Sequence, residues 1–446
     1  MKLCNVKKLF SANETPRLRC ALFLLIAAPL GHTEDVLTLP PPPEVIRGGH
    51  VDFLAGTPDD EKDNTVSVFY ATKRLPAEDG TWYRKKFDDI LRVGSAQLQI
   101  GRDGLPWSVL HIEATKASEP RMAFDITLTG VSESAELAPD ASLDTLSKGM
   151  RAYIDQIDAA MAKAGTDHVT IIAHGAFNSF YYAMAEAAQY RFYTGKRAVV
   201  IAYSWPAVEN DLAYGRNVKN AEASEAALNR LIKILAKFSK AERINLLGYS
   251  VGGRLIGGAM AALADEYAAG KGLDKAHEEL RLGHLYLTSS DQPLEQFRNY
   301  VPSFAKMFDL ITVTASYHDP ILGRAELTGG GDRLGRPPKP TDKKHGPTAA
   351  EKQAILAAVQ SNRLHLLNLE TTDIPGYEFV HGAWYLNPWV SSDVIVSMNL
   401  KLHPSERGLV ATGDDYKWPV WFFPPEYVNT LQEALEKHSQ KATPSN

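Results

Sequence analysis

The chain has 446 residues, of which 44% are hydrophobic and 23% are charged, and its formal net charge is -5. This composition is typical of globular proteins, and the acidic balance does not favour nucleic acid as a partner, because nucleic-acid-binding surfaces are normally basic. The length would allow two or three domains, although single α/β domains also reach this size.

The N-terminus has the order of an export signal. Basic residues precede an apolar run at 20–29, and a polar stretch and four prolines at 40–43 follow it. The run has about the length of a signal-peptide core and is too short to span a bilayer as a helix. We therefore expect a signal peptide over 1–31, a proline-rich linker over 32–64, export to the periplasm or the cell exterior, and no stable transmembrane span after processing. The alternatives are an uncleaved anchor or an artefactual upstream extension.

Both cysteines, Cys4 and Cys20, lie in this leader. A processed chain would contain no cysteine, so we expect neither a disulfide framework nor a cysteine-ligated metal in it.

Near residue 146 the predicted secondary structure changes from strands to a helix, and strands and helices then alternate. Residues 65–113 predict mixed strands, including the segment WSVLHIEA that begins at Trp107, and a helix is expected over 146–164. From residue 169 onward, short apolar runs alternate with segments of helical periodicity. The expected strands are 169–175, 198–206, 243–250, 282–291, 308–319 and 364–370, and the expected helices are 179–193, 224–240 and 255–268.

Alternating strands and helices predict an α/β fold with a mostly parallel sheet covered by helices on both faces. The carboxyl ends of the strands then meet at one edge, where ligands usually bind. We expect this domain to occupy 65–440, with an N-terminal β extension. A segment at about 327–350 is rich in Gly, Pro and Lys and predicts a flexible loop, either an insertion without a role or a lid.

One motif in this pattern predicts chemistry. Residues 248–252, with Ser250 at the centre, fit G-x-S-x-G. The pattern alone arises by chance, but here a predicted strand precedes it and a predicted helix follows it. This setting is the one that the nucleophile elbow of the α/β-hydrolase fold requires. We expect Ser250 to be a nucleophile, since the helix N-terminus beneath it favours developing negative charge.

A serine hydroxyl needs a base within hydrogen-bond reach, and the base needs an acid that orients it. In this fold the chain order is serine, acid, histidine. His381 follows the last predicted strand and is the expected base, whereas His403 lies in a polar stretch and His365 lies inside a strand. Two carboxylates end strands after the elbow, and we favour Asp319 as the acid with Asp291 as the alternative. The residue that is not used would cap the next helix.

The oxyanion of such a reaction needs two backbone N–H donors. We expect one from Val251, which follows the nucleophile, and the other from Ala176, in the loop after the strand at 169–175. Gly175 would let the backbone approach the substrate, and His174 is expected to be structural. Four aromatic residues follow strand ends and would form either an apolar acyl pocket or ordinary core: Trp205, Tyr214, Phe177 and Trp384.

Several segments in this order resemble the motifs of one family. They are VFYATKR at 68–74, HGAFN at 174–178, YSWP at 203–206 with Tyr214, the elbow with Arg254, Ser290-Asp291, HDPIL at 318–322, RLG at 333–335, and HGAWY at 381–385 with Asn387-Pro388. From about residue 66 to 396 the chain is similar to bacterial lipase-like α/β hydrolases of otherwise unassigned function. The resemblance implies a hydrolase fold with a serine triad at Ser250, Asp319 and His381. Tyr249 and Ala176 depart from the family's usual His and aromatic residue, so the mechanism transfers better than the substrate preference.

The sequence therefore predicts a serine hydrolase that cleaves a small-molecule or lipid ester through an acyl-serine intermediate, without cofactor or metal. Two alternatives keep the same fold. An acyltransferase would use the same residues with an acceptor other than water, and a non-catalytic binding protein would use none of them. The acyl length and the oligomeric state are not determined by the sequence.

Overall fold

A computed structural model of the chain describes residues 36–49, 51–78, 82–210, 213–339, 349–361, 363–372, 378–412 and 419–442. The predicted signal peptide lies outside the described residues. The first four residues of the predicted linker and residues 340–348 of the predicted flexible loop lie outside them as well.

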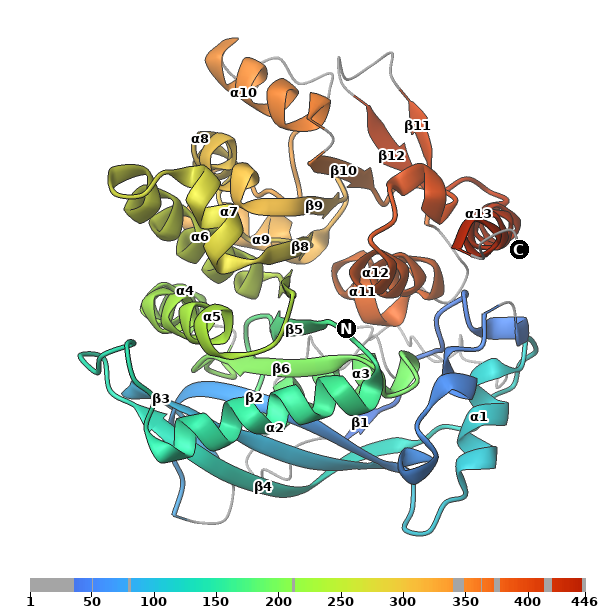
Figure 1. The fold of residues 1–446 in the computed structure, drawn as a ribbon. Helices are drawn as coiled ribbons and strands as arrows, with labels where there is room; N and C mark the ends of the chain where they lie inside the picture. Colours follow the sequence, from blue (N-terminus) through green and yellow to red (C-terminus); the bar gives the residue numbers. More distant parts are fainter. Residues whose placement is uncertain are drawn as a thin grey trace, which may run out of the picture.

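Within the described residues, the strands form one twelve-stranded sheet in the order β1-β4-β3-β2-β6-β5-β7-β8-β9-β10-β12-β11 (Figure 1). Their bounds are β1 Leu37–Thr38, β2 Thr65–Pro76, β3 Tyr83–Ile100, β4 Asp125–Leu137, β5 His168–Ala173, β6 Val199–Ser204, β7 Arg243–Tyr249, β8 Leu282–Thr288, β9 Phe308–Ala315, β10 Leu364–Asn368, β11 Val410–Thr412 and β12 Val420–Phe422.

The central part of the sheet is parallel, from β2 through β6, β5, β7, β8, β9 and β10 to β12. Antiparallel strands flank it, with β3, β4 and β1 beyond β2 and β11 beyond β12. Every residue of β5, β6 and β8 is buried. Strands that are apolar throughout are expected where helices cover both faces of a parallel sheet, so the predicted fold class is confirmed.

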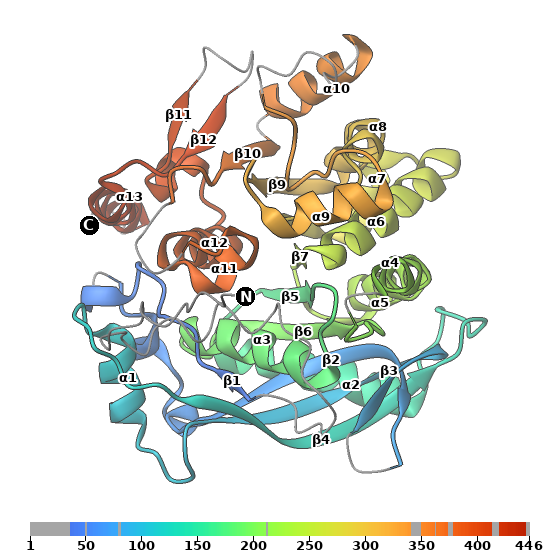
Figure 2. The ribbon, with the colours of Figure 1, turned by 180° about the vertical axis from the view of Figure 1, so that it is seen from behind.

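The helices form two layers, one on each side of the sheet. Figure 1 shows α5, α6 and α8 on one side and α11, α12 and α13 on the other, and Figure 2 shows the same layers from behind. The bounds are α1 Trp107–Thr115, α2 Lys148–Ala164, α3 Phe180–Tyr193, α4 Tyr214–Glu222, α5 Glu225–Phe238, α6 Val251–Ala269, α7 Leu273–Leu280, α8 Leu294–Phe304, α9 Pro320–Gly329, α10 Ala349–Gln360, α11 Ala383–Leu386, α12 Pro388–Leu400 and α13 Tyr427–Ala442.

Adjacent residues of the central strands point to opposite faces of the sheet and so pack in different apolar cores. Ile171 and Leu246 belong to the core beneath α2, α5, α6 and α8, whereas Ile172 and Leu247 belong to the core beneath α3, α12 and α13. This alternation follows from the period of two of a β-strand. The sheet is therefore held by two separate apolar cores, and both contribute to the rigidity of its strand ends.

The strand predicted for WSVLHIEA is wrong, because Trp107–Thr115 forms α1. The two fully buried residues of this segment are Leu110 and Ala114, four positions apart. That spacing places both on one face of a helix. The short strands β11 and β12 were not predicted, since three residues are too few to show a periodicity.

The segment that we expected to be a linker packs against the α/β domain from residue 37 onward. The Leu37 amide donates to the Tyr181 hydroxyl on α3, and the Glu44 and Val45 amides donate to Pro388 O and Ser392 Oγ on α12. This segment therefore bridges α3 and α12, and the first strand of the sheet is part of it.

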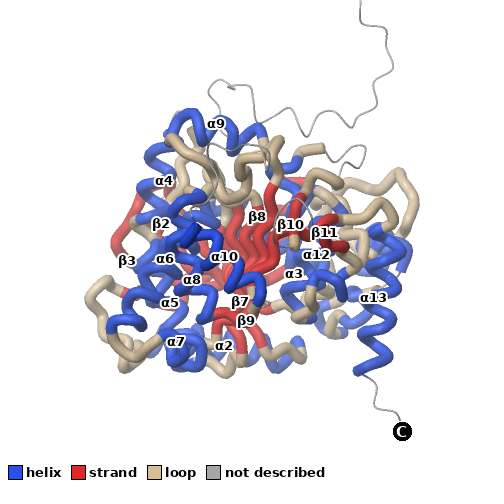
Figure 3. The backbone as a smooth tube through the Cα atoms, turned by 90° about the horizontal axis from the view of Figure 1, so that it is seen from above, coloured by secondary structure: helices blue, strands red, loops and turns tan. Residues whose placement is uncertain are grey.

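The carboxyl ends of the parallel strands all lie at the same edge of the sheet. Seen from above in Figure 3, α4 and α9 lie at one end of the molecule, and α7 lies at the other. The chain leaves β7 for α6 and β9 for α9 at this edge, so segments far apart in sequence come together there.

Candidate active site

Ser250 occupies a sharp turn between β7 and α6. Its backbone angles are φ 53° and ψ -120°, a region that non-glycine residues rarely adopt. Glycines on either side permit the turn. A Cβ on Gly248 would stand 2.7 Å from Gly253 Cα, and one on Gly252 would overlap the carbonyl oxygens of Ala173 and His174. The predicted elbow is therefore present, and close backbone packing is the reason for its glycines.

The Ser250 hydroxyl meets an imidazole from a distant part of the chain. His381 Nε2 lies 3.1 Å from Ser250 Oγ, and the two residues are 5% and 6% exposed. The imidazole is carried by a 3-10 turn, Val380–Gly382, immediately before α11. The Tyr249 ring packs beside it, with the ring centroids 5.3 Å apart. Packing on the ring limits its rotation and keeps Nε2 directed at the hydroxyl.

Asp319 orients this imidazole from the other side. His381 Nδ1 lies 2.8 Å from Asp319 Oδ2, and the other carboxylate oxygen accepts the amides of Ile321 and Leu322, each at 3.0 Å. Asp319 is the N-cap of α9, so helix geometry fixes its side chain. A carboxylate at Nδ1 favours the tautomer with a proton there, which leaves Nε2 free to accept the serine proton.

The alternative acid, Asp291, takes another position. Arg333 Nε lies 3.0 Å from Asp291 Oδ1, and the Tyr214 hydroxyl donates to both carboxylate oxygens at 2.9 and 2.7 Å. Burial raises the pKa of the Asp291 carboxyl, and the Arg333 guanidinium opposes this shift. The capping role that we expected for the unused acid is wrong for Asp291, because Pro293 is the N-cap of α8.

The two expected oxyanion donors flank Ser250. Val251 is the first residue of α6. Ala176 follows Gly175, on which a Cβ would stand 3.3 Å from Ser250 Cβ. Among the residues that the structure describes, neither the Val251 amide nor the Ala176 amide donates to another group of the protein. Both amides are thus available to an oxygen atom of a ligand.

The loop that carries Ala176 is held from two sides. Arg74 Nη2 donates to Asn178 O at 2.8 Å, and Asn178 Nδ2 donates to Glu186 Oε1 at 2.7 Å. Phe177, which lies between Ala176 and Asn178 in the chain, adopts a φ of 64°, which is unusual for an aromatic residue. Burial raises the pKa of the Glu186 carboxyl to about 8. The loop therefore keeps a strained conformation that its neighbours stabilise.

Sequence reasoning missed Glu186, although a signal for it exists. It is the only acidic residue of α3, whose other buried residues are apolar or aromatic apart from Gln189 and Arg191. A lone carboxylate in such a helix is costly to bury, so its presence indicates a specific partner.

His174 has the structural role that we expected. Its Nδ1 donates to Gly175 O at 2.7 Å, and its ring stacks on Trp205 at a centroid distance of 5.0 Å. Trp205 Nε1 in turn donates to His174 O at 2.8 Å. Burial lowers the pKa of His174 to about 3, so the ring stays neutral.

The aromatic residues proposed for an acyl pocket divide between two roles. Trp205 and Trp384 lie in the core, at 0% and 2% exposed, and Tyr214 binds Asp291. Phe177 is half-buried and follows Ala176 in the chain. The core alternative is therefore correct for the two tryptophans. The remaining histidines considered as bases pair with each other, since the rings of His365 and His403 lie 4.8 Å apart.

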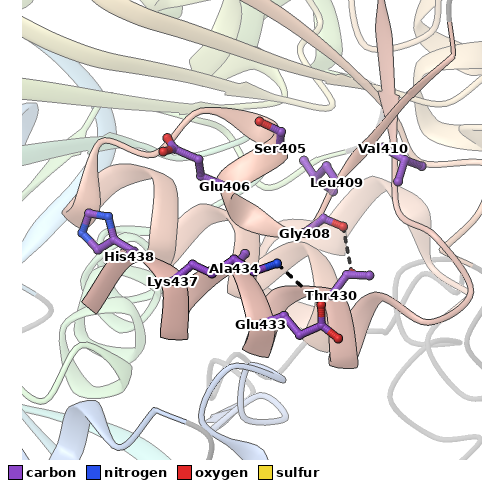
Figure 4. A pocket seen from close by; sticks show the side chains of 10 residues that line it. All are labelled: Ser405, Glu406, Gly408, Leu409, Val410, Thr430, Glu433, Ala434, Lys437 and His438. Carbon is purple, nitrogen blue, oxygen red and sulfur yellow. Dashed lines mark hydrogen bonds and ion pairs between the residues drawn. The ribbon is translucent and has the colours of Figure 1, made fainter. Parts of the chain in front are cut away.

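A hollow of about 310 Å³ lies between the C-terminal helix α13 and the turn that precedes β11 (Figure 4), and Ser250 is not among its lining residues. Its lining includes Glu406, Glu433 and Lys437, with Thr430 donating to Gly408 O.

Two further searches concern metals and membranes. Among the described residues, no group of three or more His, Cys, Asp or Glu side chains is arranged to hold a metal ion. Every helix in the described ranges is too short or too polar to cross a bilayer.

Comparison with known proteins identifies a family. The sequence model of a family described as an alpha/beta hydrolase of unknown function (DUF900) matches residues 151–381. This span covers more than half of the chain, and it begins in α2 and ends at His381. No curated protein and no solved structure matches the chain.

Proposed function

Because the chain belongs to this family of α/β hydrolases, we propose that it is a serine hydrolase that cleaves a carboxylic ester through an acyl-serine intermediate. One observation carries the proposal. Ser250, His381 and Asp319 form a continuous chain of contacts of 3.1 and 2.8 Å, in a site where all three side chains are buried. Hydrogen bonds and charges act strongly in such a site, because little water competes with them.

The contacts support the following role for each residue in the proposed reaction. His381 Nε2 accepts the proton of the Ser250 hydroxyl as Oγ attacks the ester carbonyl carbon. The same imidazole then returns the proton to the leaving alcohol oxygen, which departs and leaves the acyl group on Ser250. Water attacks the acyl carbon by the reverse sequence and releases the acid. Asp319 keeps the imidazole in the required tautomer and stabilises its positive charge.

The negative charge that develops on the carbonyl oxygen requires donors. The amides of Val251 and Ala176 fill this role, because both are unoccupied and flank Ser250. Each such donor is typically worth roughly 3 kcal/mol of barrier lowering. The N-terminus of α6 adds a favourable dipole at the same place. The reaction needs no group beyond these side chains and amides.

A serine-reactive fluorophosphonate probe tests the proposal. We expect stoichiometric labelling of the wild type, no labelling of Ser250→Ala, and full labelling of a Ser405→Ala control on the C-terminal side of the molecule. Esters graded by acyl length would then define the substrate, and products formed in the presence of added alcohols would separate hydrolysis from acyl transfer. A folded wild type that is inert toward the probe and toward every ester would overturn the proposal in favour of a non-catalytic binding role.

We further propose that the protein is exported. The basic and apolar order of the first 31 residues supports this, and a cut after Gly31 would retain the contacts that begin at Leu37. N-terminal sequencing of protein recovered from outside the cytoplasm should give a start near residue 32. Recovery of chains that begin at Met1 in the cytoplasm alone would contradict export.

A further inference from the structure

Three segments meet at the carboxylate of Asp291, and we refer to Asp291, Arg333 and Tyr214 as the Asp291 network. Tyr214 is the first residue of α4, Asp291 follows β8, and Arg333 follows α9. Arg333 and Asp291 are each 1% exposed. Burying two charges in this way is expensive unless further hydrogen bonds satisfy them, and the Tyr214 hydroxyl supplies one that is shared between the two carboxylate oxygens. The hydrogen bonds that join these three side chains do not involve His381 or the Ser250 hydroxyl.

The network reaches the nucleophile through the backbone of Asp291. The Asp291 amide donates to Ser250 O at 3.0 Å. The neighbouring Ser290 side chain packs against Gly253, on which a Cβ would stand 2.5 Å from Ser290 Oγ. Any displacement of Asp291 is therefore passed to the elbow that carries the serine.

The network reaches the acid through α9. Arg333 Nη2 donates to Ala325 O at 3.0 Å, and Nη1 donates to Gly330 O at 2.8 Å and Gly331 O at 2.9 Å. A cation is favourable at this carboxyl end of the helix. Asp319 caps the opposite end of the same helix, so the guanidinium holds the helix whose first turn binds the acid.

The segment around Arg333 also separates the two strand ends. Gly335 N donates to Ser290 O, and Ser316 N donates to Gly335 O, each at 2.9 Å. A Cβ on Gly335 would stand 2.5 Å from the backbone of Ser289 and Ser290. The segment thus lies directly between the end of β8, which supports the serine, and the end of β9, which leads to the acid.

We propose that Arg333 is a positioning residue that sets the separation of Ser250 and Asp319 by binding Asp291 and the end of α9 at the same time. This inference rests on the proposed function. Arg333 touches no reacting atom, and it acts by keeping the acid in register with His381. Its fork of donors suits this position, because Nε binds the carboxylate, Nη2 binds a carbonyl of α9, and Nη1 binds a carbonyl just past the end of α9.

The test compares Arg333→Gln with a matched arginine in the same segment. Arg336 forms an ion pair with Glu326 nearer the surface, so Arg336→Gln removes a guanidinium without disturbing the Asp291 network. We expect Arg333→Gln to lower the rate of fluorophosphonate labelling and kcat by roughly 10- to 100-fold, as a misplacement of about 1 Å does. KM and the fraction of folded protein, measured by circular dichroism, are followed in parallel. Arg336→Gln should label at the wild-type rate.

A second readout separates positioning from a loss of folded protein. The labelling rate constant reports the geometry at Ser250, whereas the labelling amplitude reports the fraction of folded protein. A misplaced acid should lower the rate constant and kcat of Arg333→Gln, while KM and the amplitude stay at the wild-type values. A smaller folded fraction would lower the amplitude without changing the rate constant.

Further variants keep the inference open to refutation should Arg333→Gln not fold. Arg333→Lys retains a charge without the fork, and Tyr214→Phe leaves the ion pair in place, so both should lower the labelling rate constant by less than about tenfold. Wild-type rate constants in the folded variants would overturn the inference alone. Absence of labelling in the wild type would overturn the proposed function and the inference with it.

Discussion

His381 Nδ1 lies 2.8 Å from Asp319 Oδ2, on a carboxylate whose other oxygen accepts two amides at the start of α9. A single side chain thus begins a helix and orients an imidazole. The arrangement gives the acid little freedom, because any rotation that leaves His381 would also remove the helix cap. It also makes the acid testable, since asparagine caps helices about as well as aspartate does.

The Asp319→Asn variant should therefore fold normally and lose esterase activity. We expect kcat for a reactive ester to fall about 10⁴-fold, because the amide favours the wrong imidazole tautomer. Asp291→Asn should instead leave Arg333 buried without its countercharge and lower the free energy of unfolding by about 3–5 kcal/mol. Its kcat should fall by no more than about 100-fold, by loss of positioning. Urea unfolding and ester kinetics on both variants measure these effects, and the reverse pattern would assign the acid to Asp291.

The elbow glycines give a prediction with a close control. An alanine at position 252 would place its Cβ against the carbonyl oxygens of Ala173 and His174, which are backbone atoms and cannot move aside. We expect Gly252→Ala to destabilise the protein by at least about 1–3 kcal/mol and to abolish probe labelling. Gly215→Ala on α4 meets nothing within 4 Å and should leave both unchanged or raise stability slightly. Labelling of Gly252→Ala at the wild-type rate would argue against the elbow as described.

Glu186 should make stability depend on pH. Its pKa is about 8 in the folded protein against 4.5 for an ordinary glutamate, so the folded chain holds a proton there that the unfolded chain has released. This contribution is complete below about pH 4.5 and is lost as the pH rises toward 8. Relative to Glu186→Gln, the wild type should lose on the order of 1.4 kcal/mol of unfolding free energy per pH unit in this range. Urea unfolding of both proteins from pH 5 to 8 measures the difference, and parallel curves would refute it.

A second buried ion pair provides a contrast to the Asp291 network. Arg407 Nη1 lies 2.8 and 2.7 Å from the two oxygens of Asp393, and both side chains are 0% exposed. Arg407→Gln should lower the free energy of unfolding by about 3–5 kcal/mol without changing kcat of the folded protein. The surface pair of Lys237 and Asp144 is the control, and Lys237→Gln should change stability by less than about 1 kcal/mol. Loss of kcat in folded Arg407→Gln would show that this pair also serves the site.

Much of the site was predictable because its signals are local. The elbow consists of five consecutive residues, and a strand before it and a helix after it are visible as apolar patterns. The oxyanion loop likewise follows directly on an apolar strand. Where a local pattern was ambiguous, as in WSVLHIEA, the prediction was wrong, because the spacing of Leu110 and Ala114 only has meaning once the face that is buried is known.

The sequence by itself determined the parallel sheet, the turn that carries Ser250, and the candidates for its base and acid. Only the tertiary structure showed that Asp319 contacts His381 whereas Asp291 contacts Arg333, and it alone placed Glu186. The reason is distance along the chain. His381 contacts residues 131 and 62 positions away, and two carboxylates at neighbouring strand ends look alike until their partners, an imidazole for one and a guanidinium for the other, are brought to them by the packing of the sheet.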